Sequence, residues 1–158
     1  VLETNLKKAP DLSRVEVWRS EIWRHCDDEP KPSRDEAVQR LIEILLDLIR
    51  RAERANLALA PFIGIGCPGR IEPDGTIEPG RQTLPGQREG ERFNLPDRIV
   101  EAIPRIGDHD TMVMMHNDAV VQGLSEVPHF HGVERWGVLT IGTGLGNARF
   151  TSRKSVAE

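Results

Sequence analysis

The fold of this chain is indicated first by the stretch MVMMHND at residues 112–118, an apolar run that ends in Asn117 and Asp118. A second apolar run, VLTI at 138–141, ends in the glycine-rich turn GTGLG at 142–146. A carboxylate at the end of a strand can accept a proton from an attacking hydroxyl group. Glycines let backbone N–H groups approach phosphate oxygens without a side chain between them. The two stretches together indicate phosphoryl transfer.

The remaining segments alternate between helix and strand patterns. Ser33 to Glu36 has the sequence of a capping box, and the helix after it is expected to run to about Ala55, with Asn56 as its stop. We expect helices at 97–103 and 119–126, a hairpin at 71–77, and strands at 57–66, 111–116, 136–141 and 149–151, with an interrupted strand within 15–23. This order predicts a single α/β layer in which strands 111–116 and 136–141 are neighbours.

Three segments of unusual composition follow predicted strand ends, namely 64–69, 117–118 and 142–146. Ligands of open α/β sheets gather outside the carboxyl ends of the strands. The three segments therefore predict one site at one edge of the sheet. Residues 79–90, rich in glycine and proline, are expected to form a loop over it.

Composition limits the classes of partner. The chain has 158 residues, with 21 Lys and Arg against 25 Asp and Glu, and a net charge of −4. An acidic balance argues against nucleic acid as a partner. Two cysteines, Cys26 and Cys67, do not make a disulfide framework, and no apolar run is long enough to cross a membrane. We therefore expect a cytoplasmic protein with no membrane or nucleic-acid partner, and keep a homodimer open.

The segments, in this order and spacing, resemble the ROK family of sugar kinases (repressors, open reading frames and kinases), which belongs to the superfamily of actin, hexokinase and heat-shock ATPases. The resemblance covers about residues 62–150. It is carried by GIGCPG at 64–69, FNLP at 93–96, NDAVVQGLSE at 117–126 and LTIGTGLG at 139–146. It implies a ribonuclease H-like (actin-like ATPase) lobe with a mixed sheet and flanking helices.

The resemblance also implies an activity, the transfer of a phosphoryl group from ATP to a hexose hydroxyl, with Mg²⁺ bound to the phosphates. On this interpretation Asp118 is the general base. The other implied site residues are Asn117, Asn94, Gly66, Pro68 and Gly69 for the sugar, and Gly142, Thr143 and Gly144 for the phosphates. No metal-ligating side chains are implied, and His129 and His131 near Glu126 are interpreted as a solvated loop.

The chain also departs from the family pattern. The family's first phosphate hairpin, Asp followed by Gly-Gly-Thr, does not occur in it, and Asn147 and Ala148 replace the usual glycine pair. The family's Glu-x-Gly-His segment and cysteine-rich zinc site are also absent from the sequence. We therefore expect one incomplete lobe over 1–158, with residues 1–31 unassigned and a polar tail at 152–158, that is inactive as a kinase by itself.

Three alternatives remain open on the sequence alone. The chain can be a sugar-sensing module of a ROK-type transcriptional regulator, part of a glucokinase that uses polyphosphate, or a structural remnant. Each motif also has a structural explanation. Asn117 and Asp118 can be a helix cap, the glycines at 142–146 a plain hairpin turn, and Cys67 a small buried residue.

Overall fold

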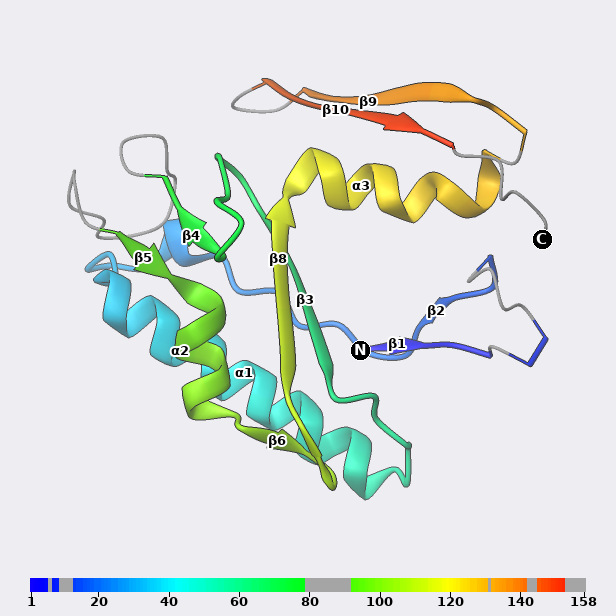
Figure 1. Cartoon of the computed structure of the whole chain (residues 1–158). Coiled ribbons are helices and arrows are strands. Elements are labelled where there is room, and N and C mark those ends of the chain that lie inside the picture. Colours follow the sequence, from blue (N-terminus) through cyan, green and yellow to red (C-terminus); the bar gives the residue numbers. More distant parts are fainter. Residues whose placement is uncertain (6, 9–12, 79–91, 131, 142–144, 153–158) are drawn as a thin grey trace.

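The computed structural model describes residues 1–5, 7–8, 13–78, 92–130, 132–141 and 145–152 of the chain. Helices and short sheets alternate along these residues, which confirms the predicted α/β class. Figure 1 shows helices α1 (Arg34–Arg54) and α2 (Leu95–Ala102) on one side of strands β3 (Phe62–Cys67) and β8 (Met112–Asn117). A third helix, α3 (Asp118–Glu126), crosses above the ends of these strands.

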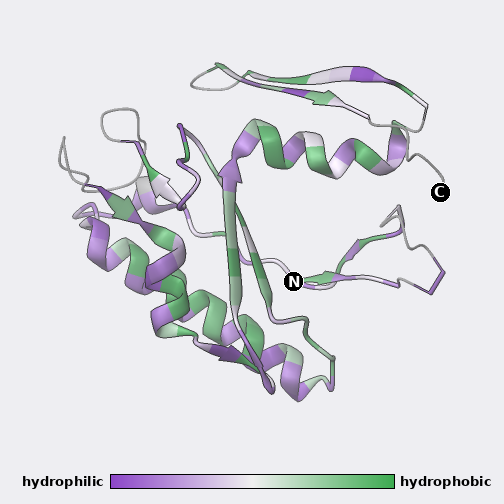
Figure 2. Ribbon diagram, in the orientation of Figure 1, coloured by the Kyte–Doolittle hydropathy of each residue, from purple (hydrophilic) through white to green (hydrophobic). Residues whose placement is uncertain are grey.

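The pair of parallel strands β3 and β8 forms the centre of the molecule. Phe62 lies opposite Met112 at one end of the pair, and Cys67 lies opposite Asn117 at the other. Figure 2 shows both strands coloured as hydrophobic along most of their length. Alternate side chains from the two strands join the core formed with α1 and α2, namely Ile63, Ile65, Val113 and Met115. Parallel strands end at the same edge, so the segments after Cys67 and Asn117 start side by side.

The strand β3 differs from its prediction in length and in burial. It begins at Phe62 rather than at Leu57, because pairing with β8 starts at Met112. Phe62 and Met112 are more than half exposed, and Met114 nearly so. The predicted strand at 57–66 is therefore present in its second half, but its predicted start and its predicted burial were wrong, since the helices cover only one face of this pair.

The helix α1 begins and ends where the sequence predicts. The Ser33 hydroxyl oxygen accepts a hydrogen bond from the Glu36 backbone N–H at 3.3 Å, and the Glu36 carboxylate accepts one from the Ser33 N–H at 2.8 Å. This is the predicted capping box. At the other end Asn56 has a φ of 56°, a left-handed conformation that commonly terminates a helix.

The predicted hairpin at 71–77 is present, with Ile71 bridged to Ile77. Gly75 in its turn has a φ of 81°, and a Cβ atom there would lie 3.1 Å from Pro96. The end of the hairpin, β4 (Thr76–Ile77), pairs with β5 (Phe93–Asn94), which leads directly into α2. The hairpin is thereby held against the start of α2, which begins slightly before its predicted position.

The prediction that strands 111–116 and 136–141 are neighbours was wrong. The strand β8 pairs with β3, whereas β9 (Arg135–Ile141) pairs with β10 (Leu145–Thr151) in a separate antiparallel sheet. Figure 1 shows this second sheet on the far side of α3 from β3 and β8. The helix therefore lies between the two sheets, and each sheet packs against it.

Aromatic packing explains why β9 and β10 lie on α3. The ring of Trp136 stacks on Phe150 with centroids 4.3 Å apart and on Phe130 with centroids 4.7 Å apart. A Cβ atom at Gly123 of α3 would lie only 2.1 Å from Phe150, so the ring occupies the space that a side chain at Gly123 would need. The hairpin is thus held on α3 by aromatic rings that pack where Gly123 leaves the helix without a side chain.

The remaining described elements are short: β1 (Leu2–Glu3), β2 (Glu16–Val17), η1 (His25–Asp27), β6 (Arg105–Ile106), β7 (His109–Asp110) and η2 (Val127–His129). Only β2 falls within the interrupted strand predicted at 15–23. The predicted loop at 79–90 lies outside the described residues. Among the described helices, none combines the length and apolar character needed to span a membrane.

Replacing Gly123 with alanine should loosen the hairpin from α3. The added methyl group would overlap Phe150, and the stacked ring of Trp136 limits where Phe150 can move. We expect a net loss of about 1–2 kcal/mol, because overpacking outweighs the better helix propensity of alanine. Urea unfolding followed by tryptophan fluorescence measures this loss. Gly66→Ala is the matched control, because its nearest neighbour would be at 3.6 Å, and a Gly123→Ala variant as stable as that control would contradict the packing.

The capping box should make stability depend on pH. Hydrogen bonds from the Ser33 hydroxyl, and then from the Ser33 backbone N–H, lower the pKa of Glu36 from its ordinary value of 4.5. The unfolded chain therefore binds this proton more readily, so the contribution to stability is complete above about pH 4.5 and is lost as the pH falls below it. Ser33→Ala should flatten that part of the pH profile in urea unfolding. Ser125→Ala should not, because the Ser125 hydroxyl donates to the backbone carbonyl of Gln122.

Candidate functional site

The ends of β3 and β8 are joined by a side chain. The Asn117 amide donates a hydrogen bond from Nδ2 to the backbone carbonyl of Gly69 at 2.9 Å, across 48 residues of sequence. Gly69, whose carbonyl accepts this bond, has a φ of 105°, a conformation that residues with a side chain disfavour. The structure therefore brings together the loop that contains Pro68 and Gly69 and the Asn117–Asp118 pair.

Asp118 is half-buried at the first position of α3. Its Oδ1 accepts a hydrogen bond from the Ala119 backbone N–H at 2.9 Å. A carboxylate has further lone pairs beyond this bond, so Asp118 can still accept a proton or a hydrogen bond from a ligand. Its position at a helix N-terminus also places it among backbone N–H groups that point outward.

The start of β10 lies beside Asp118. A Cβ atom on Gly146 would be 3.6 Å from Asp118 Oδ1 and 3.4 Å from the Ala119 methyl group. The start of β10 therefore reaches the same edge as the ends of β3 and β8, although it belongs to another sheet. Gly142, Thr143 and Gly144, predicted to bind phosphate, lie outside the described residues. Gly146 closes the glycine-rich segment 142–146 that the sequence predicted at this edge, although no ligand contact was assigned to Gly146 itself.

The Asn117 side chain forms hydrogen bonds with other groups of the protein at both its oxygen and its nitrogen. Its Oδ1 accepts from the Ala119 N–H at 3.0 Å and caps α3, while its Nδ2 holds Gly69. The structural explanation of the pair as a helix cap is thus correct for Asn117. The amide keeps one N–H and one lone pair for a ligand.

Asn94 has a similar double role at a different place. Its Oδ1 accepts from the Asp97 N–H at 3.0 Å and caps α2, and its Nδ2 donates to the Asp74 carbonyl at 2.8 Å. Both of these hydrogen bonds fix the hairpin at 71–77 to α2. Neither hydrogen bond connects Asn94 to the region of Asp118. The hydrogen bonds of Asn94 therefore give no support to the prediction that the two residues share one sugar site.

Gly66 and Cys67 lie at the end of β3, under α3. A Cβ atom on Gly66 would be in ordinary contact with Val121 at 3.6 Å, so a small side chain fits there. The Cys67 thiol is buried and lies 3.5 Å from the Pro68 carbonyl. Burial, and then the negative charge of Asp118, raises the pKa of Cys67 to about 11. The thiol is therefore neutral at ordinary pH, as the interpretation of Cys67 as a small buried residue requires.

No group of three or more His, Cys, Asp and Glu side chains in the described part of the chain is arranged to hold a metal ion. Comparisons of the chain with protein-family models, with curated proteins and with solved structures each found no match. The ROK resemblance therefore stays a prediction that rests on the motifs and on the geometry around Asp118.

The proximity of Asp118 to Cys67 can be tested by alkylation. At about pH 8 the raised pKa should slow the reaction of Cys67 with iodoacetamide about 100-fold relative to a free cysteine. Asp118→Asn should speed this reaction, because the charge that helps to raise the pKa is removed. Peptide mass spectrometry separates Cys67 from Cys26, and Asp97→Asn serves as a control at the exposed start of α2. An unchanged Cys67 rate in Asp118→Asn would mean that the two groups do not interact.

Proposed function

We propose that this chain is part of a ROK-type sugar kinase that transfers a phosphoryl group from ATP to a hexose hydroxyl. The observation that supports the proposal best is the convergence at Asp118. Asn117, which precedes Asp118, holds the Gly69 loop, and Gly146, the last residue of the predicted glycine-rich turn, lies beside the Asp118 carboxylate. A sugar-binding loop, a base and a phosphate turn at one edge are what the reaction requires.

The proposed chemistry assigns one step to Asp118. A sugar hydroxyl is a weak nucleophile, and a carboxylate within hydrogen-bonding distance accepts its proton as the phosphoryl group is transferred. The Gly69 loop would orient the sugar, with the free N–H of Asn117 as a further contact. Magnesium would neutralise charge on the phosphates, which Gly142, Thr143 and Gly144 would bind through their backbone N–H groups.

We also propose the ribonuclease H-like (actin-like) lobe as the fold behind this site. The proposal rests on the parallel pair β3 and β8 with helices on one face, and on α3 leading from β8 to a glycine-rich hairpin. It does not rest on a continuous sheet, because β8 and β9 belong to different sheets. A polyphosphate donor in place of ATP would use the same base and the same turn.

The role of Asp118 can be separated from its structural role by substitution. In the intact protein that contains this chain, Asp118→Asn should lower kcat by about 10²–10⁴ while leaving sugar binding largely in place. Asparagine keeps the shape and the Ala119 hydrogen bond, but it cannot accept the proton. Turnover and both KM values, measured with glucose and related hexoses and with ATP or polyphosphate, test this.

The control for this measurement is Asp97→Asn, which changes the same side chain at the start of α2, where the carboxylate is exposed. It should leave kcat unchanged. A variant Asp118→Asn that retains most of its turnover would remove Asp118 from the chemistry. A protein that binds a hexose tightly but transfers no phosphoryl group would instead favour the sugar-sensing alternative.

A further inference from the structure

A hollow with a volume of about 120 Å³ lies between the start of α1 and the strand β5. Its walls are almost entirely apolar. Its floor is formed by Val38, Phe93 and Leu95, each less than a tenth exposed. None of the residues that line it belongs to the predicted sugar or phosphate site, so it is a separate feature of the molecule.

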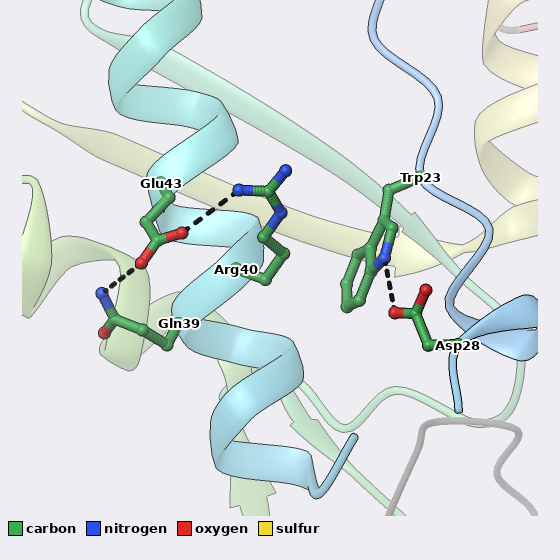
Figure 3. Close-up of polar contacts among 5 residues, drawn as sticks. All are labelled: Trp23, Asp28, Gln39, Arg40 and Glu43. Carbon is green, nitrogen blue, oxygen red and sulfur yellow. Dashed lines mark hydrogen bonds and ion pairs between the residues drawn. The ribbon is translucent and has the colours of Figure 1, made fainter. Parts of the chain in front are cut away.

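The rim of the hollow is aromatic and half-buried. Trp23 and His25 line it from the segment before α1, with their ring centroids 5.7 Å apart. Figure 3 shows the Trp23 indole with its N–H directed to Asp28, and the bond measures 2.9 Å. The polar atom of the indole is thus engaged outside the hollow. The ring therefore offers carbon surface, rather than a hydrogen-bond donor, to anything that enters.

One charged residue contributes to the wall. The guanidinium carbon of Arg34 lies 4.9 Å from the centroid of the Phe93 ring, in cation–π contact, and the Arg34 Nε and Nη1 atoms are buried. A ligand that buried a charged group against these apolar walls would lose hydration that the walls do not replace. An uncharged aromatic ring would instead add a further aromatic face beside the Arg34–Phe93 contact and the rings of Trp23 and His25.

The volume selects the size of the ligand. An engineered apolar cavity of about 150 Å³ in another protein takes up benzene. A hollow of about 120 Å³ with one open side accommodates a single six-membered ring, whose substituent can extend into solvent. Water binds weakly in an apolar void of this size, because it finds no polar groups there to form hydrogen bonds with.

We propose that the hollow bounded by Trp23, Phe93 and Ala37 is a binding site for a small molecule that ends in one uncharged aromatic ring. The ring inserts between Trp23 and Phe93 and points toward Val38 and Leu95. The site discriminates against charged ligands through its apolar walls. The proposal is independent of the kinase chemistry, since the ligand touches neither Asp118 nor the Gly69 loop.

The experiment uses benzyl alcohol as a probe and the full chain as the protein. Titration followed by NMR should shift the methyl resonances of Val38, Leu41 and Leu95 with a dissociation constant of about 1 mM. Benzylamine, which has the same ring and a positive charge, should bind at least about fivefold more weakly, because its ammonium group loses more hydration beside apolar walls. Contacts between ring protons of the probe and the Val38 and Leu95 methyl groups, seen as nuclear Overhauser effects, locate the site in the unmodified protein.

A substitution that fills the hollow gives the second test. Ala37→Leu adds three carbon atoms at the wall and should weaken benzyl alcohol binding at least about tenfold. Ala102→Leu is the matched control on the exposed side of α2 and should leave binding unchanged. Circular dichroism checks that each variant is folded, and if Ala37→Leu is not, the nuclear Overhauser contacts decide. The proposal is overturned if these methyl groups show no saturable shifts up to about 20 mM probe, or if folded Ala37→Leu binds as well as the control.

Discussion

The parallel pairing of β3 with β8 is the constraint on which the candidate site depends. Its register places Cys67 opposite Asn117, so the loop after β3 and the helix after β8 begin at one edge. A shift of the register by one residue would turn Asn117 to the opposite face and break its hydrogen bond to Gly69. The geometry around Asp118 thus follows from a pairing between segments far apart in sequence, stabilised by the core side chains of both strands.

Local signals predicted the individual elements well. The capping box at Ser33 and the stop at Asn56 fixed both ends of α1, and proline at position 96 indicated the start of α2. These signals act within a few residues, so a single sequence contains them. Local signals predicted the pairing between strands less well than the elements themselves. The turn at 142–146 indicates that β9 pairs with β10, but the apolar pattern at 136–141 does not show whether β9 also pairs with β8. The hairpin instead packs on α3 through Phe150 and Gly123, a contact between distant residues that no local pattern reveals.

The sequence predicted which segments around Asp118 lie close together, and the roles of their residues stay predictions. Placement after strand ends correctly brought Asn117 to the Gly69 loop. Even so, the argument from a single sheet was wrong for the third segment, which reaches Asp118 through Gly146 from a separate hairpin. The sequence also did not indicate that Asn117 and Asn94 each form two hydrogen bonds with other groups of the protein. Asparagine suits caps and ligands for the same chemical reason, so the residue type alone does not separate the two roles.

The same hydrogen bonds explain how a small sheet can hold the Asp118 carboxylate in place. Two strands have little stability by themselves, and one face of this pair is open. The position of Asp118 must therefore be fixed from other directions. Met115 and Cys67 anchor the covered face in the core, Asn117 ties the end of β8 to both the Gly69 loop and α3, and the aromatic hairpin packs on the opposite side of α3. The hydrogen bonds at the Ala119 N–H act directly on the first turn of α3, so the orientation of the carboxylate follows from the helix cap rather than from the sheet.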